Sequence, residues 1–176
     1  MKFKKFQKQL VIQEVLKVLD FCRICDIIYS MTIKLSEIRT MAEQDMKIDG
    51  SSLDTESLRT PQIHNKYLSI MLDEKLVLKK LDSDLNIVKR NKWLYYSGKM
   101  SDEQLKDLGW EPFDLAILRQ DLDRFIDSDV QVIELSNKLE LQKEKVNYLE
   151  NLVKVISNRN WNIRSAIDWI KFTQGQ

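Results

Sequence analysis

The chain has 176 residues and a formal net charge of +1, with 43% hydrophobic and 31% charged residues. Four glycines and two prolines are too few for the many tight turns of a β-sandwich or barrel, so the composition predicts an all-α protein. Because the net charge is small, any affinity for nucleic acid must come from local clustering of cations and not from the field of the whole protein.

Residues 1–30 are interpreted as an N-terminal extension, separate from a helical domain over residues 31–176. Lysines precede an apolar stretch from 10 to 28, but charged residues interrupt it: Glu14, Lys17, Asp20, Arg23 and Asp26. The extension is therefore neither a signal peptide nor a membrane span, and it reads as an amphipathic helix without an assigned function. Met31 is a plausible alternative start, and we expect a chain beginning there to fold, oligomerise and bind its ligand.

Cys22 and Cys25 form a lone C-x-x-C pair. The other ligands of a zinc site are missing, and an all-α pattern lacks the βαβ context of a thioredoxin-like redox centre. His64, the only histidine, is interpreted as an ordinary helix residue. No metal or cofactor is expected.

From Met31 onward, a short amphipathic helix is predicted at about 33–47, followed by a turn at 48–52. Thr60 at an N-cap and Pro61 at the first helical position then predict the start of a helix region at about 60–100. Its seam alternates in steps of four and three, as in a coiled coil. The seam residues are Tyr67, Met71, Leu78, Leu81, Leu85, Val88 and Tyr95, with Glu74 and Lys92 as polar exceptions.

The end of this helix region mixes cations with aromatic rings. Cations neutralise phosphates, and exposed rings stack on unpaired bases, so the segment is typical of a single-stranded nucleic-acid site. The candidate residues are Lys89, Arg90, Lys92, Trp93, Tyr95, Tyr96 and Lys99. The alternative is that the rings belong to the core and the cations are simply solvated. Charge is segregated along the chain, with seven cations against two carboxylates over 75–99 and nine carboxylates against three cations over 101–129.

Three elements are predicted after Ser97-Gly98, which should end the helix. Ser101 and Gln104 form a capping box for a short helix closed by Gly109. Residues 113–126 read as another amphipathic helix. Ser128 and Gln131 form a second capping box, which starts the longest helical run of the chain, at about 128–174.

The seam of this last run extends from Val132 to Ile170, and an unbroken helix of that length would measure about 65 Å. A compact domain cannot cover it alone, so self-association is expected. The candidate oligomerisation residues are Val146, Leu149, Val153, Ile156, Ile163, Ile167 and Ile170. Gln142 and Asn160 are polar seam positions of the kind that fix register, unless residues 158–160 break the helix into two.

The carboxylates Asp121, Asp123, Asp127 and Asp129 raise the possibility of a metal-dependent nuclease. Asp121 and Asp123 point to different faces of a helix, and no second acidic cluster or histidine completes a two-metal site. A solvated acidic turn is the preferred interpretation. No phosphate loop, nucleophile elbow or HExxH motif is present, so catalytic residues are not expected.

Residues 33–174 resemble the UvsY-type recombination mediator proteins of T-even-like bacteriophages, especially the cyanophage versions. The resemblance rests on four segments: 54–67 (DTESLRTPQIHNKY), 93–99 (WLYYSGK), 118–129 (LRQDLDRFIDSD) and 158–169 (NRNWNIRSAIDW).

The resemblance implies a non-enzymatic protein that binds single-stranded DNA as a hexameric or heptameric ring. Such proteins loosen the phage single-strand-binding protein and help to load a RecA-like recombinase of the UvsX type, in the cytoplasm of the infected host. The basic segment before the tyrosine pair is tied to DNA binding, which here implicates Arg90 and Lys92, and the C-terminal region is tied to self-association. A coiled-coil scaffold or adaptor without nucleic-acid binding is the alternative function.

Overall fold

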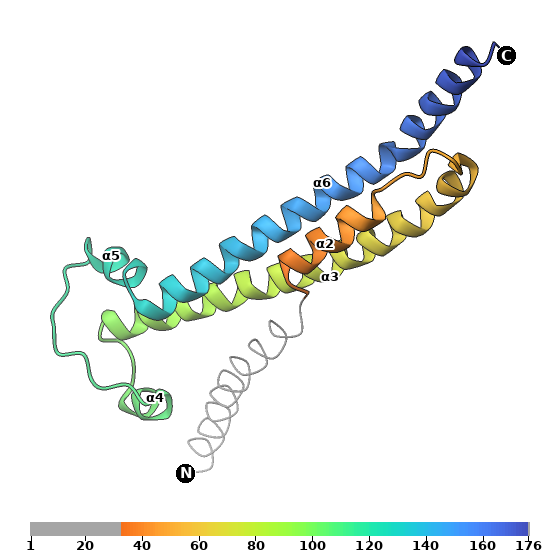
Figure 1. Ribbon diagram of the computed structural model, residues 1–176. Coiled ribbons are helices and arrows are strands. Elements are labelled where there is room, and N and C mark those ends of the chain that lie inside the picture. Colours follow the sequence, from red (N-terminus) through yellow and green to blue (C-terminus); the bar gives the residue numbers. More distant parts are fainter. Residues whose placement is uncertain (1–32, 176) are drawn as a thin grey trace. The chain divides into compact units, whose positions relative to one another are not determined.

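The computed structural model describes residues 33–175, and within this range the chain forms helices and no strands. The helices are α2 (Leu35–Asp45), α3 (Leu53–Tyr96), α4 (Asp102–Leu108), α5 (Leu122–Asp127) and α6 (Val130–Thr173) (Figure 1). The all-α prediction is confirmed. The predictions for residues 1–30, Cys22 and Cys25 lie outside the described residues. None of the described helices is long and apolar enough to cross a membrane.

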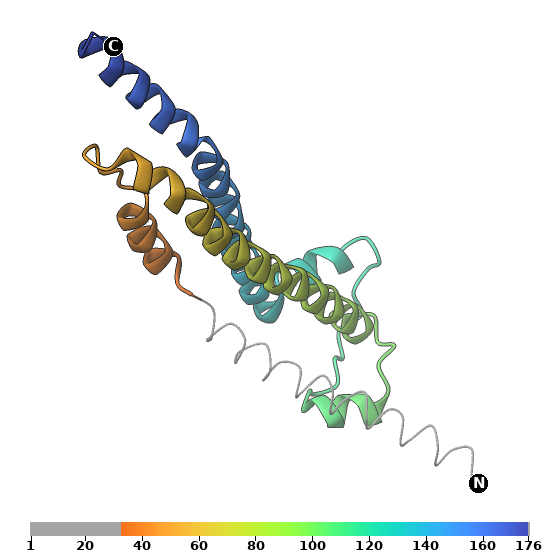
Figure 2. The ribbon, with the colours of Figure 1, turned by 90° about the vertical axis from the view of Figure 1, so that its right-hand side faces the viewer.

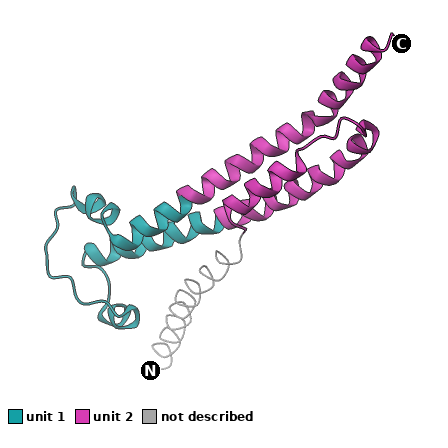
Figure 3. Cartoon of the chain, viewed as in Figure 1, with its two compact units in different colours: residues 1–31, 79–139 teal, residues 32–78, 140–176 magenta. Residues whose placement is uncertain are grey.

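The chain divides into two compact units, which Figure 3 distinguishes by colour. The described part of unit 1 is residues 79–139. Unit 2 combines residues 33–78 with the segment from 140 onward. Because α3 and α6 each continue from one unit into the other, both units contain part of the same long helix pair.

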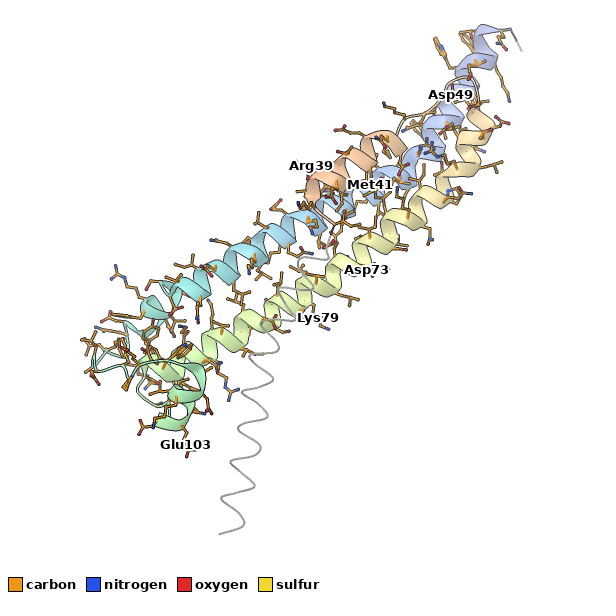
Figure 4. All side chains as sticks on the ribbon, turned by 60° about the horizontal axis from the view of Figure 1, so that its bottom comes forward. Arg39, Met41, Asp49, Asp73, Lys79 and Glu103 are labelled. Carbon is orange, nitrogen blue, oxygen red and sulfur yellow. The ribbon has the colours of Figure 1, made fainter. Side chains whose placement is uncertain are left out.

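Unit 2 packs α2 against the first half of α3 and the second half of α6, and both ribbon views show α2 beside α3 (Figures 1 and 2). Its buried core contains residues from all three helices: Ile38, Ala42, Ile63, Tyr67, Met71, Leu149, Leu152 and Ile156. Met41 adds to this core from α2 (Figure 4). Its neighbour Arg39 places its guanidinium carbon 5.6 Å from the ring centroid of Tyr148.

Polar side chains join α3 to α6 at two places inside unit 2. The side-chain amide of Gln142 donates to the carbonyl oxygen of Glu74 at 3.0 Å, and the Lys145 ammonium lies 3.1 Å from the Glu74 carboxylate. Further along, the guanidinium of Arg159 donates to the carbonyl oxygen of Glu56 at 3.0 Å and pairs with its carboxylate. The later residue of α3 meets the earlier residue of α6 and the reverse, so the two helices are antiparallel in this unit. The predicted polar seam position at Gln142 is confirmed.

The predicted start of α3 at Thr60 is wrong, because the helix begins at Leu53 and contains Pro61. Proline lacks the amide hydrogen that an interior helix position normally donates. The carbonyl that loses this donor is that of Ser57, four residues earlier. The neighbouring Glu56 carbonyl accepts two side-chain hydrogen bonds, from the Thr60 hydroxyl at 3.1 Å and from Arg159 at 3.0 Å. Side chains from α3 and α6 thus meet at the Glu56 carbonyl, one residue before the interrupted position.

Unit 1 contains the end of α3, the short helices α4 and α5, and the start of α6. The capping box of Ser101 with Gln104 and the left-handed Gly109 that ends α4 are both confirmed. The predicted helix over 113–126 is wrong, because only Leu122–Asp127 is helical. The preceding segment leaves the helical path. Phe113 instead packs against Tyr96 of α3, and Ile117 packs against the cluster of Leu122, Ile126 and Val132.

The start of α6 is also capped by a different residue than predicted. Asp129, and not Ser128, accepts a hydrogen bond from the main-chain amide of Gln131 at 2.9 Å, while the Ser128 hydroxyl donates to the carbonyl of Phe125. Asp129 is thus the side chain that satisfies a free amide in the first turn of α6. The helix then runs without a break through residues 158–160.

Candidate functional site

The candidate site lies where α3 ends, in unit 1. Gly98 adopts the left-handed conformation, with φ of 65°, which costs glycine little because it has no Cβ. The main-chain amide of Lys99 donates to the carbonyl oxygen of Leu94 at 3.0 Å, and the amide of Gly98 donates to the carbonyl oxygen of Tyr95 at 3.1 Å. These two bonds form a Schellman motif. The helix therefore stops directly after the basic and aromatic residues that the sequence analysis singled out.

Lys92 points into unit 1 and not toward solvent. Its ammonium lies 2.9 Å from the Asp129 carboxylate, and each of the two side chains is only 9% exposed. The Tyr96 hydroxyl donates to the same carboxylate oxygen at 2.8 Å. Burial acts to raise the pKa of Asp129, but the hydrogen bonds from Lys92 and Tyr96 outweigh it and lower that pKa below its ordinary value. Asp129 is therefore a carboxylate that accepts from both side chains.

Aromatic rings surround this ion pair. The Tyr95 ring is 5.1 Å from each of Tyr96 and Trp110, and Phe113 is 5.1 Å from Tyr96, measured between centroids. The Lys92 ammonium is 4.1 Å from the Trp110 centroid, a cation–π contact. Burial, followed by the hydrogen bond to Asp129, raises the pKa of Tyr96 to about 12. Both tyrosines thus serve as packed side chains in this ring cluster.

The remaining candidates lie on the solvent side of α3. Arg90 is exposed, and the Trp93 ring remains 39% exposed. The Lys99 ammonium lies 4.4 Å from the centroid of the Trp93 indole. We call Arg90 and Trp93 of α3, together with Lys99 in the turn directly after it, the outer face of α3. It brings two cations next to a partly open aromatic ring, which is the combination that phosphates and unpaired bases require.

Lys89 occupies an intermediate position at the edge of this outer face. Its ammonium is 2.9 Å from the Asp127 carboxylate, and the side chains of Lys89 and Asp127 are 42% and 66% exposed. Exposed ion pairs of this kind contribute little to stability and exchange readily with solvent or with other anions. The structure therefore divides the predicted residues into an exposed group, an edge residue and a packed group of Lys92, Tyr95 and Tyr96.

The predicted oligomerisation residues of α6 divide in a similar way. Val146, Leu149, Ile156 and Ile163 are buried within the chain itself, and Leu149 and Ile156 belong to the core of unit 2. Val153 and Ile167 are half-buried, and Ile170 is 37% exposed. Much of the predicted seam thus packs against the chain's own helices, as does the seam of α3.

A different set of apolar side chains is open to solvent near the end of α6. Trp161 is 71% exposed, Trp169 66% and Phe172 76%. The rings of Trp169 and Phe172 are in contact, with centroids 5.9 Å apart and planes tilted by 33°. We call these three residues the C-terminal aromatic surface. The heptad pattern did not single them out, although large aromatics at polar positions of a helix were a visible signal.

The acidic residues 121–129 do not gather into a metal site. In the described range, no group of histidine, cysteine, aspartate and glutamate side chains is arranged to hold a metal ion. Asp127 and Asp129 instead face Lys89 and Lys92. Asp129 is the important site residue that sequence reasoning missed in this role. The sequence signal for this role was the position of Asp129, an aspartate directly before a long helix, where a side chain can cap the helix.

The fold and this site define an all-α protein whose long antiparallel helices carry a basic and aromatic outer face at one helix end. The chain belongs to the UvsY family, since residues 41–176 match the family model described as "Recombination, repair and ssDNA binding protein UvsY". No curated protein sequence matches it.

Solved structures with a similar fold include the bacteriophage T4 recombination mediator protein UvsY in two lattice types. The lattice type II structure has a TM-score of 0.71 at 15% sequence identity, and the match covers 81% of this chain and 98% of that one. The lattice type IV structure gives a TM-score of 0.70 at 16% identity, with 80% and 99% covered. At this identity the likeness concerns the fold.

Proposed function

We propose that this protein is a recombination mediator. It binds single-stranded DNA and promotes the loading of a RecA-like recombinase onto strands covered by single-strand-binding protein, in phage recombination and repair within the host cytoplasm. The observation that carries the proposal is the match of residues 41–176 to a family described by recombination, repair and single-stranded DNA binding. In this role the protein acts by binding its partners, without catalysing a reaction.

We assign DNA contact to the outer face of α3. Arg90 and Lys99 neutralise phosphates, and the open part of the Trp93 ring stacks on a base. Lys89 joins them by exchanging Asp127 for a phosphate, because its present ion pair is exposed. Lys92, Tyr95 and Tyr96 belong to the same site and support it from inside. Binding of this kind contacts phosphates and the flat faces of bases, which all nucleotides share, so it has little sequence preference.

We assign self-association to the end of α6. The C-terminal aromatic surface exposes three large rings on α6, two of them in contact with each other, and exposed apolar side chains that lie together mark interaction sites. A ring of subunits, hexameric or heptameric, gathers several weak DNA sites onto one strand and multiplies their effective concentration. Association therefore serves DNA binding as well as burial of the exposed rings.

The test is a fluorescence-anisotropy titration of a labelled oligothymidylate with the full chain, repeated over a salt series. We expect the logarithm of the binding constant to fall linearly with the logarithm of the salt concentration. A second measurement follows the DNA-dependent ATPase of a RecA-like recombinase on DNA covered with single-strand-binding protein, with and without the full chain. We expect the chain to shorten the lag. A protein without DNA binding at any salt concentration would instead be a coiled-coil scaffold.

A further inference from the structure

We infer that Lys92 and Asp129 are a positioning pair for the DNA site, and that Lys92 does not contact phosphate. The inference rests on the proposed function and deepens it, because it separates the cations that read DNA from the cation that holds the site together. Sequence alone groups Lys92 with its basic neighbours. The contacts of its ammonium set it apart.

The ammonium of Lys92 is already fully engaged inside unit 1. It lies 2.9 Å from the Asp129 carboxylate and 4.1 Å from the Trp110 ring centroid, and the whole residue is 7% exposed. To reach a phosphate it would have to leave both partners and expose a buried carboxylate to an approaching anion. Breaking a buried pair in this way is strongly unfavourable, because one charge stays behind without compensation.

Asp129 makes three contacts that connect two helices through one carboxylate. One oxygen accepts from Lys92 and from the Tyr96 hydroxyl, both on α3. The other oxygen accepts from the amide of Gln131 and so caps α6. The carboxylate therefore fixes the last turns of α3 against the first turn of α6. A side chain with a single oxygen acceptor could not make both connections with this geometry.

The pair positions the outer face because of helix geometry. Arg90 and Trp93 are three residues apart and are neighbours on the helix surface, whereas Lys92 points to the inside. Holding Lys92 against Asp129 sets the rotation of the last turns of α3, and with it the direction of Arg90 and the Trp93 ring. The pair carries no net charge, so it contributes nothing to counterion release on DNA binding.

The experiment compares Lys92→Met with Arg90→Gln, two variants that each remove one positive charge from the same helix end. Methionine retains an unbranched apolar stem against Trp110. For Arg90→Gln we expect the salt slope of oligothymidylate binding to fall by about 0.7, the value of one phosphate contact on a single strand. For Lys92→Met we expect affinity to fall by about tenfold while the salt slope stays unchanged.

The double variant Lys92→Met/Asp129→Asn decides the assignment. Asparagine still caps α6, and removing both charges leaves no unpaired ion in the interior, which is often nearly neutral. We expect affinity to recover from the Lys92→Met level to about that of Tyr96→Phe, because the single oxygen of asparagine caps α6 and no longer accepts from the Tyr96 hydroxyl, again with an unchanged slope. Circular dichroism at the binding temperature verifies that each variant is folded. A further variant, Tyr96→Phe, removes only one hydrogen bond to Asp129 and should reduce affinity less than Lys92→Met.

Each outcome has a defined meaning. A reduced slope in Lys92→Met, without rescue in the double variant, would make Lys92 a phosphate contact and overturn the inference alone. Folded Lys92→Met and Tyr96→Phe proteins with unchanged affinity would reduce the pair to a purely stabilising role, which also overturns it. Absence of binding by the unmodified chain in the same titration would overturn the proposed function together with the inference.

Discussion

The guanidinium of Arg159 donates to the main-chain carbonyl oxygen of Glu56 at 3.0 Å and pairs with the carboxylate of the same residue. It also donates to the Thr60 hydroxyl at 3.2 Å and to the carbonyl of Lys47 at 3.0 Å. Arg159 is only 1% exposed. One side chain of α6 thus holds the start of α3 and the turn before it.

Replacing Arg159 by methionine is expected to destabilise the protein by up to about 3–5 kcal/mol, because the Glu56 carboxylate stays buried with only the more distant Arg59 guanidinium, at 3.8 Å, as a partner. Urea unfolding followed by circular dichroism measures the change. The matched control is Arg164→Met, since Arg164 is exposed on the same helix and surface substitutions typically change stability by less than about 0.5 kcal/mol. Equal unfolding midpoints for the two variants would show that the buried pair does not stabilise the fold.

Replacing Trp93 by leucine is expected to weaken binding to single-stranded DNA by about 1–3 kcal/mol, the usual contribution of one stacked base. Bases of a duplex are already stacked, so affinity for duplex DNA of the same length should change much less. Anisotropy titrations with both ligands measure this difference. An equal loss on the two ligands would argue that Trp93 supports the fold of the site and does not stack on a base.

Introducing glutamate at Trp169 and Phe172 is expected to dissociate the oligomer and to lower DNA affinity, because avidity is lost while each DNA site survives. Multi-angle light scattering gives the mass, and the same samples are titrated with oligothymidylate. Leu141→Glu is the control, because Leu141 is 64% exposed on α6 outside the C-terminal aromatic surface. If the unmodified chain is already a monomer, self-association is excluded.

Charges at the buried seam should act differently. Val146 is 5% exposed within the chain itself, so Val146→Glu is expected to unfold the subunit, because an unpaired carboxylate cannot be accommodated in the interior. Thermal unfolding by circular dichroism distinguishes this outcome from dissociation of a folded subunit. A folded Val146→Glu monomer would indicate that the seam joins subunits after all.

Stability should decrease in acid partly through Asp45. Its carboxylate accepts from the Lys66 ammonium at 2.7 Å and from the Tyr67 hydroxyl at 3.0 Å. The hydrogen bond from Lys66, with smaller help from Tyr67 and Arg59, lowers the pKa of Asp45 despite burial. Because the folded pKa lies below the unfolded one, the contribution is complete above the ordinary aspartate pKa and is lost as pH falls through the folded value.

The measurement for Asp45 is urea unfolding at about pH 5.5 and about pH 3, on either side of the ordinary aspartate pKa. We expect Asp45→Asn to be less stable than the unmodified chain at the higher pH and to lose less stability on acidification. Asp73→Asn, an exposed position on α3 (Figure 4), is the control. An identical acid dependence in the unmodified chain and Asp45→Asn would contradict the assignment.

Local rules predicted the elements that local contacts determine. The capping box at Ser101 and the left-handed Gly109 depend on residues within a few positions of each other, and both are present. The polar exceptions on the seam of α3 were also predicted, since Glu74 and Lys92 are buried, but the buried Asp84 was not among the predicted positions. Periodicity identifies which face of a helix is covered, whatever covers it.

The errors arose where contacts between distant residues decide the outcome. The heptad spacing predicted that Asn160 is a buried seam position of α6, but Asn160 is exposed and Arg159 is buried. Arg159 can be buried because Glu56 pairs with it. The segment after Phe113 has a helical pattern, yet packing of Phe113 on Tyr95 and Tyr96 holds it outside a helix. The sequence also could not show that Lys92 is buried while Arg90 is exposed, because the partner that holds Lys92 inside, Asp129, is distant in the sequence.

The two polar links of unit 2 have a consequence for how this protein can change in length. Glu56 and Glu74 on α3 meet Arg159 and Gln142 on α6, and the two helices span nearly the same number of residues between these links. Inserting a turn between the links in one helix alone would separate one donor from its acceptor. Insertions and deletions in this stretch should therefore occur in pairs during evolution, one in each helix.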